Sequence, residues 1–220
     1  MPFDVFFRQG SSILVCGPSG SGKTTLVAQI LKHKELLFDA PSSKVFLFYT
    51  QPQEIYEELV TNGIITKMFH GYPSYDEIRK IVAPYKKLGG SIILLDDQLS
   101  NLSDDLVRIF HELTHHCNTT CFFLSQNLFY ANKKYRSISL NANYMILTKN
   151  VRDQTQIMHL AKQFAPYRES YVVQSFMDVS KKMFGYMVFD YHQKSADITR
   201  VRTNILPHEL PVTVFIENSR

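Results

Sequence analysis

The residues best suited to chemistry form a glycine-rich segment near the start of the chain. Its sequence is Gly17-Pro18-Ser19-Gly20-Ser21-Gly22-Lys23-Thr24, which matches the pattern G-x-x-x-x-G-K-[ST] at every fixed position. In this pattern the backbone N–H groups of the loop converge on a β-phosphate, the lysine reaches the β- and γ-phosphates, and the hydroxyl joins a Mg²⁺ shell. We therefore predict that residues 17–25, including Thr25, bind a nucleoside triphosphate, with Lys23 as a catalytic cation and Thr24 as a metal ligand.

A pair of acids, Asp96 and Asp97, follows the apolar run Ile92-Ile93-Leu94-Leu95. Taken alone, these acids would be more typical of a solvated turn after a strand. With a phosphate loop upstream they fit the Walker B pattern, in which one carboxylate holds Mg²⁺, usually through water, and the next polarises the attacking water. We predict that Asp96 is a metal ligand and that Asp97 is the general base.

The next apolar run ends in Leu124-Ser125-Gln126-Asn127. In a sheet that carries a phosphate loop, a polar residue at this place faces the γ-phosphate and orients water. Gln126 is the candidate for that role. On local sequence alone, a polar residue that merely ends the strand is nearly as good an interpretation.

A second pattern, His111-Glu112-Leu113-Thr114-His115, matches the zinc-protease signature H-E-x-x-H. On a helix its two histidines would share a face and could ligate Zn²⁺, with Glu112 as base. The longer metzincin form fails, because Asn118 stands where it needs glycine and Cys121 where it needs the third histidine. A zinc metalloprotease stays as the alternative from another class of function, and a helix covering the sheet is the favoured interpretation.

The phosphate loop, the acid pair and Gln126 each follow a short run of apolar, β-branched or aromatic residues, and these runs are expected to form the strands that hold them in place. They do not alternate polar with apolar residues, which is typical of strands buried on both faces of a parallel sheet. The predicted strands are 12–16, 45–49, 91–95, 120–124 and 144–148, and the predicted helices lie near 23–36, 52–61, 75–83, 103–116 and 153–164. Strands that alternate with helices predict an α/β fold with helices on both faces of the sheet.

The last part of the chain has a different pattern. Residues 184–191 and 197–205 flank a polar turn and predict a C-terminal β-hairpin attached to the sheet. We therefore expect one domain over 1–220, with a core over about 11–165 and a C-terminal helix and hairpin over about 168–206.

Composition agrees with one soluble globular domain. The 220 residues are 45% hydrophobic and 20% charged, which excludes disordered, collagen-like and disulfide-scaffold classes. The 3 cysteines form no CxxC pair, and neither a signal peptide nor a membrane span is evident. We expect an intracellular protein. The net charge of +4 permits a nucleic-acid partner without requiring one.

Several branches of phosphate-loop proteins can be separated by sequence. A GTPase is disfavoured because no N-K-x-D element follows, and a small-molecule kinase lacks an evident arginine-rich lid. One strand that ends in an acid, followed by another that ends in a polar residue, fits the RecA/ASCE-like branch, in which an extra strand lies between the two motif strands. The fuel is then expected to be ATP with Mg²⁺.

A more particular resemblance rests on segments that follow in order. They are Leu94-Leu95-Asp96-Asp97, Phe123 to Phe129, Arg136 to Tyr144, Lys149-Asn150-Val151-Arg152-Asp153 and Arg200 to Ile205. This series resembles the genome-packaging ATPases of the FtsK/HerA superfamily, especially those of Polinton/Maverick elements, adintovirus-like viruses, virophages and large DNA viruses. The resemblance covers about residues 11–206. One departure is Asp97, where many members carry glutamate.

This resemblance implies an ATP-driven motor that moves double-stranded DNA into a viral capsid. Its implied partners are DNA bound without sequence specificity, further copies of the chain in a ring, and a capsid or portal-vertex protein, at an assembly site in the host cytoplasm or nucleus or in the virion. A related DNA translocase or helicase is the nearest alternative.

In such rings an arginine from the neighbouring subunit completes the site, since a guanidinium stabilises the charge of the transition state. Arg152 is the first candidate, expected to open a helix after the last parallel strand, followed by Arg136 and then Arg202 as a nucleotide sensor. The basic loop Lys133-Lys134-Tyr135-Arg136 is the first candidate for DNA contact, ahead of Lys86-Lys87 and Lys181-Lys182. A surface arginine paired with an acid, or a solvated cluster, is the alternative for each.

Overall fold

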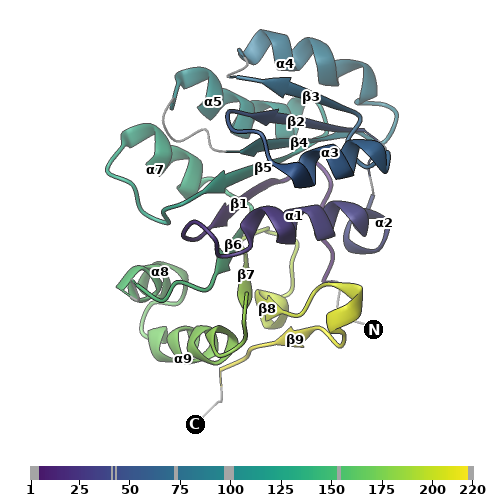
Figure 1. Cartoon of the computed structure of the whole chain (residues 1–220). Helices are drawn as coiled ribbons and strands as arrows, with labels where there is room; N and C mark the ends of the chain where they lie inside the picture. Colours follow the sequence, from purple (N-terminus) through teal and green to yellow (C-terminus); the bar gives the residue numbers. More distant parts are fainter. Residues whose placement is uncertain are drawn as a thin grey trace.

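A computed structural model describes residues 5–40, 42, 44–71, 74–96, 102–152 and 155–217. Within these ranges one nine-stranded sheet has the order β3-β2-β4-β5-β1-β6-β7-β8-β9 (Figure 1). The strands are β1 Ser12–Cys16, β2 Val45–Tyr49, β3 Lys67–His70, β4 Ser91–Asp96, β5 Thr119–Ser125, β6 Tyr144–Thr148, β7 Tyr186–Asp190, β8 Val201–Thr203 and β9 Thr213–Val214.

The first six strands are parallel, and every residue of β1, β4, β5 and β6 is buried. Burial on both faces explains their unbroken apolar sequences. β5 lies between β1 and β4 and pairs directly with β4, so the extra strand separates the strand before the phosphate loop from the strand that ends in Asp96. The expectation of a strand between β4 and β5 is therefore wrong. The six parallel strands confirm the predicted α/β phosphate-loop fold with a mainly parallel sheet.

Helices cover both faces of this sheet (Figure 1). Their bounds are α1 Lys23–Lys32, α2 Lys34–Leu37, α3 Glu54–Thr61, α4 Tyr75–Val82, α5 Asp104–Arg108, α6 Thr114–His116, α7 Lys133–Leu140, α8 Thr155–Phe164 and α9 Glu169–Ser180. Alternate residues of β1 point to opposite faces. Ile13 and Val15 join a core with α1, α2 and α3, whereas Leu14 and Cys16 join a core with α4, α5, α7, α8 and α9. The three-layer prediction is therefore confirmed.

Helix α5 begins as its sequence predicts. The Ser103 side chain caps it by accepting a hydrogen bond from the Leu106 N–H at 3.1 Å. The helix passes through a π-helical stretch, Ile109–Leu113, before α6. Among the described residues, no helix combines the length and apolar character that a bilayer crossing requires.

The C-terminal part extends the sheet, as the hairpin prediction requires. β7 is antiparallel to β6 and to β8, and β8 is antiparallel to β9. Tyr186, the first residue of β7, pairs with Thr148, the last residue of β6. The turn that joins α9 to β7 therefore lies at the carboxyl edge of the parallel strands.

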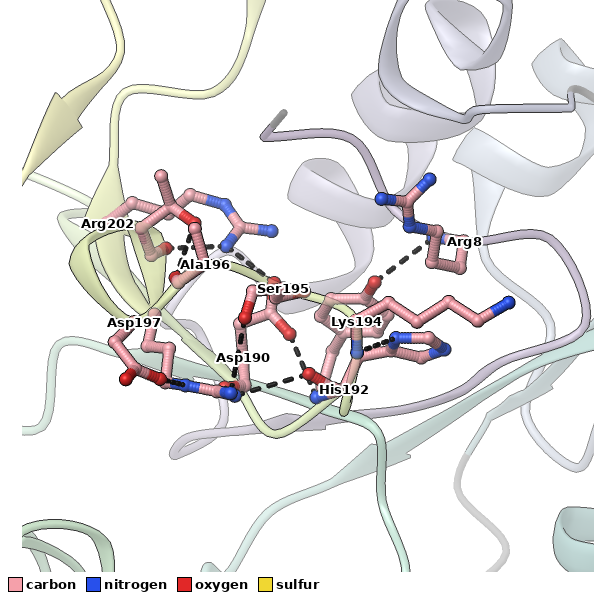
Figure 2. Close-up of polar contacts among 11 residues, drawn as sticks. Arg8, Asp190, His192, Lys194, Ser195, Ala196, Asp197 and Arg202 are labelled. Carbon is pink, nitrogen blue, oxygen red and sulfur yellow. Dashed lines mark hydrogen bonds and ion pairs between the residues drawn. The ribbon is translucent and has the colours of Figure 1, made fainter. Parts of the chain in front are cut away.

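A buried ion pair joins the two strands of this hairpin (Figure 2). Arg202 is 0% exposed, and its Nη1 donates to Asp190 Oδ2 at 2.8 Å and to the Thr199 carbonyl at 2.8 Å. The guanidinium lies 5.9 Å from the ring centres of Phe7 and Tyr144. The interpretation of Arg202 as a nucleotide sensor is therefore wrong, because its charge is enclosed and paired within the hairpin.

Strands β3 and β9 and helix α7 were not expected from the sequence. Within the part of the chain that the structure describes, β3 is an edge strand that pairs with β2 alone. Its residues Lys67–His70 are partly exposed, so it lacks the continuous apolar run of a central strand. The expected basic loop at Lys133 is wrong, since this segment forms the first turn of α7. Asn132 caps that helix, and Tyr135 and Ile138, three residues apart, are buried beneath it.

Candidate functional site

The phosphate loop connects β1 to α1. Lys23 is the first residue of α1, and its Nζ donates hydrogen bonds to the carbonyl oxygens of Gly17 at 2.7 Å and Pro18 at 2.9 Å. Gly22 precedes the helix with φ of 86°, a left-handed conformation that favours glycine. The lysine is thus folded back over its own loop, at the positive end of the helix dipole.

The last residue of β6, Thr148, holds the phosphate loop in place through hydrogen bonds. Thr148 Oγ1 donates to the Cys16 carbonyl at 3.1 Å and is hydrogen-bonded to Ser21 Oγ at 2.7 Å. A Cβ atom at Gly17 would lie only 1.8 Å from Thr148 Oγ1. Glycine is therefore required at position 17 by close packing, and Thr148 is a loop-positioning residue that the sequence pattern did not reveal.

A pocket of about 450 Å³ lies above the loop. It brings together most of the residues predicted to act on a nucleotide, although they come from three strand ends. Those lining it are Ser19, Gly20, Gly22, Lys23, Thr24, Thr25, Asp96 and Gln126. The carboxyl ends of β1, β4 and β5 lie side by side in the sheet, and this adjacency places a cation, a carboxylate, a hydroxyl and an amide around one cavity.

Asp96 is 7% exposed and is held by residues of the segment that opens α3. Gln53 Nε2 donates to its Oδ2 at 3.0 Å, and the hydroxyl of the buried Tyr56 donates to the same oxygen. Gln53 also lines the pocket. These two residues were missed, because nothing local in the sequence links 53 and 56 to 96. Only the pairing of β2 with β4 brings them together.

Thr24 and Asp96 fit a magnesium ion. A hydroxyl and a carboxylate at the same pocket are hard oxygen donors of the kind that Mg²⁺ accepts. Both line the pocket above the phosphate loop, as the predicted roles require. Asp97, the predicted general base, lies outside the described residues.

The end of β5 is fixed by a hydrogen-bonded network beneath Gln126. The Tyr135 hydroxyl donates to Ser125 Oγ at 3.0 Å and also bonds the Asn127 carbonyl. Cys16 Sγ lies 3.6 Å from the same hydroxyl, and burial raises the pKa of Cys16 to about 12. Gln126 itself is exposed and lines the pocket, while its neighbours anchor the backbone.

No arginine is among the described residues that line this pocket. Arg136 is exposed on α7. Arg152 is exposed in a bend after β6, with its N–H bonded to Asn150 Oδ1 at 3.0 Å. Helix α8 begins at Thr155, so Arg152 precedes the helix it was expected to open. Its suggested partner Asp153 lies outside the described residues.

The H-E-x-x-H residues have separate structural contacts. Glu112 accepts hydrogen bonds from Arg108 at 3.1 and 3.3 Å, and that guanidinium lowers its pKa. His111 is half-buried, and burial lowers its pKa. Among the described residues no group of three His, Cys, Asp or Glu side chains is arranged to hold a metal.

The basic clusters lie in different parts of the fold. Lys86 and Lys87 are exposed in the turn before β4, at the amino edge of the parallel strands. The α7 segment follows β5 at the opposite edge, where Lys134 pairs with Asp104 at 3.2 Å. Lys181 lies in the turn before β7 and pairs with Asp178 at 2.6 Å. The three clusters therefore do not form one basic surface.

Comparisons with known proteins show that this chain is similar in fold to solved structures of a viral NTPase. The sequence matches no model of a protein family. A search of curated proteins finds no significant match. The genome packaging NTPase B204 from Sulfolobus turreted icosahedral virus 2, in complex with ATP-gammaS, aligns with a TM-score of 0.55 and 9% identity, covering 94% of this chain and 98% of that chain.

A second structure of the same viral NTPase, in complex with AMPPCP, has a TM-score of 0.50 and 10% identity over 94% of this chain and 97% of that chain. At this identity the likeness concerns the fold. The mainly parallel sheet with helices on both faces is that of a phosphate-loop NTPase, and the similarity covers 94% of this chain.

Proposed function

We propose that this protein is an ATPase that moves double-stranded DNA into a viral capsid, as a member of the FtsK/HerA superfamily. The observation that carries the proposal is the single pocket at which the phosphate loop, Asp96 and Gln126 converge on the ends of β1, β4 and β5. The similarity of fold to a viral genome packaging NTPase over 94% of the chain supports the packaging role.

Hydrolysis would use the residues of this pocket. The backbone N–H groups of the loop and Lys23 bind the β- and γ-phosphates and stabilise the charge that develops there. Thr24 and Asp96 would hold Mg²⁺, which neutralises phosphate charge. Gln126 orients water at the γ-phosphate side, and Asp97 is proposed to accept the proton from that water.

The active form is proposed to be a ring of identical subunits. The absence of arginine from the described lining of the pocket favours a cation supplied by a neighbouring copy. Arg152 is the first candidate because it lies just after β6, at the carboxyl edge that also carries the phosphate loop. Arg136, exposed on α7, is the second.

DNA would be held weakly by lysines and arginines on loops that face the centre of the ring, through phosphate contacts that do not read sequence. A capsid or portal-vertex protein would dock the ring at the site of virus assembly, in the host cytoplasm or nucleus. A DNA translocase or helicase without a packaging role is the second candidate, because the same pocket would serve it equally.

Steady-state ATP hydrolysis by the whole chain, with and without duplex DNA, tests the proposal. We expect hydrolysis that requires Mg²⁺ and rises when duplex DNA is added, and none in Lys23→Ala. Hydrolysis that persists unchanged in Lys23→Ala would overturn the assigned site. Equal rates with and without DNA would overturn the motor function while leaving an ATPase.

Mixing of variants tests the neighbour's arginine. Arg152→Ala and Lys23→Ala subunits are each expected to be inactive alone, and their mixture should regain part of the activity, because intact sites form between unlike subunits. The same mixture with Arg136→Ala is the comparison. Absence of recovery at every ratio for both arginines would contradict a site shared between subunits.

Strand separation distinguishes the second candidate. A packaging motor should move along a duplex without unwinding it, which can be followed by displacement of a bound protein roadblock. Release of a labelled strand from a forked duplex, dependent on ATP, would favour the helicase instead.

A further inference from the structure

A second cavity adjoins the phosphate pocket. It has a volume of about 460 Å³ and shares Gly22, Thr25 and Phe184 with the pocket above the loop. The two cavities therefore meet at the start of α1. Asp96 and Gln126 line only the first pocket, so the second cavity lies on the other side of the residues that the two cavities share.

This arrangement fixes the direction of a bound nucleotide. The terminal phosphate belongs beside Lys23, Asp96 and Gln126, which line only the first pocket. The α-phosphate must then lie toward Thr25, and the nucleoside must leave the loop on that side. The second cavity is the space that it meets.

Phe184 lines both cavities, and its backbone has an unusual conformation. Phe184 is 59% exposed although its ring lies against the loop, since a Cβ atom at Gly22 would be 3.1 Å from its Cδ1. Its φ is 55°, in the left-handed region. The next residue, Gly185, fixes this turn by accepting a hydrogen bond from Lys149 N–H at 2.8 Å.

Gly185 also keeps the turn close to α9. A Cβ atom there would lie 2.1 Å from the Val179 carbonyl oxygen. A positive φ at a bulky residue is strained, and such strain persists where the surroundings enforce it. The turn thus holds the Phe184 ring exposed beside the loop, which is the arrangement that stacking on a planar ligand requires.

The opposite wall comes from α1 and the C-terminal segment. Leu26 and Leu206 are buried and apolar, while Gln29 and Glu209 supply polar groups. The Glu209 carboxylate is fixed by the Tyr186 hydroxyl and by the Leu206 N–H at 3.2 Å. A cavity that combines an aromatic ring and apolar side chains with a fixed acceptor suits a nucleobase that carries an amino group.

We propose that this cavity binds the adenine of ATP, with Phe184 stacked on the base and Glu209 accepting from its exocyclic amino group. The proposal rests on the proposed ATPase function and adds the base-binding residues. It gives the C-terminal segment a direct part in nucleotide binding, because β7 and the segment after β8 supply the wall that the parallel core lacks.

Binding of ATP and of inorganic tripolyphosphate to Phe184→Ala, each with Mg²⁺, tests the stacking. Tripolyphosphate fills the phosphate loop without reaching the second cavity. We expect the affinity for ATP to fall by about tenfold and that for tripolyphosphate to stay within about twofold. Met183→Ala is the matched control, since Met183 is 82% exposed in the same turn and does not line either cavity.

The outcomes separate this proposal from the one on which it rests. Loss for neither ligand would overturn the base site, and equal loss for both would also overturn it, because Phe184 would then support the phosphate loop and not the base. Failure of the wild-type chain to bind either ligand, or binding that survives Lys23→Ala, would instead overturn the proposed ATPase site.

Two further measurements use the wild-type chain, so that a folding defect in the variant cannot decide the question. Irradiated 8-azido-ATP is expected to label the segments around Phe184 or 206–209, and excess ATP should prevent this. ITP, which has an oxygen in place of the amino group, should bind more weakly than ATP. Labelling confined to other segments would overturn the location, and equal affinity for ITP would overturn the role of Glu209.

Discussion

Lys23 and Arg202 are two cations of the same fold that differ in what their charge can reach. Lys23 starts α1, lies over the phosphate loop and lines an open pocket. Arg202 is on β8, is 0% exposed and meets the carboxylate of Asp190 at 2.8 Å. The Lys23 charge lies at a pocket, whereas the Arg202 charge is compensated inside the protein by Asp190, as Figure 2 shows for Arg202.

The difference follows from where each strand lies. The carboxyl ends of the parallel strands leave loops whose backbone donors need a partner, whereas β8 is placed between β7 and β9 beside aromatic side chains. A charge in that second environment is tolerated only when it is paired and hydrogen-bonded. Two basic residues of similar interest in the sequence thus have different surroundings: Lys23 lines a pocket, where we propose that it binds phosphate, and Arg202 is paired inside the hairpin.

The largest expected effect is on catalysis. Lys23→Ala should lower the rate of ATP hydrolysis by about 100-fold or more, because a cation at the transferred phosphate is lost. Its free energy of unfolding, measured in urea, should change little. Lys32→Ala, on the same helix but paired with Glu58 at 2.8 Å, is the control and should keep its rate. A large loss of stability in Lys23→Ala would contradict the comparison.

The converse effect is expected for Arg202→Met. Removing one partner of a buried pair leaves the Asp190 charge uncompensated and should cost about 3–5 kcal/mol of unfolding free energy. The variant that remains folded should bind ATP as the wild type does. Adding Asp190→Leu should restore much of the stability, since no buried charge is then left. A selective loss of ATP affinity in Arg202→Met would revive a nucleotide-sensing role.

A smaller effect is expected for Tyr56→Phe. Its hydroxyl orients Asp96, so the Mg²⁺ concentration that gives half-maximal hydrolysis should rise a few-fold, and stability should fall by about 1–3 kcal/mol. Tyr75→Phe, a hydroxyl deletion on α4 outside the pocket, is the control. An unchanged Mg²⁺ dependence would show that Tyr56 is only structural.

The smallest effect concerns Cys16, directly before the loop. Its raised pKa keeps the thiol protonated, so iodoacetamide at pH 8 should label it only after unfolding. The thiol of the unfolded chain has a pKa of about 8.5. Between that pH and about 12 the unfolded state therefore loses this proton while the folded state keeps it, so the free energy of unfolding should fall as the pH rises. Cys16→Ala should weaken that alkaline dependence. Rapid labelling of folded protein would contradict the burial.

Local pattern was sufficient where a function depends on consecutive residues. In the loop from Gly17 to Thr24, the groups proposed to bind phosphate are the backbone N–H groups of consecutive residues. The apolar runs before Asp96 and Gln126 predict strands without knowledge of the strands that pair with them. The order of the sheet then brings these ends to one pocket, as predicted. Helix α7 was missed because its buried residues, Tyr135 and Ile138, are few and stand among polar and charged residues.

The sequence by itself determined the glycine-rich loop at 17–24, the parallel core and the terminal hairpin, since each depends on residues close together in the chain. Only the tertiary structure decided that Tyr56 holds Asp96, that Thr148 closes on Gly17, that Arg202 is buried and that Phe184 borders the loop. These contacts join residues far apart in the chain, and their energies depend on burial and distance, which the pairing of strands sets and local spacing does not.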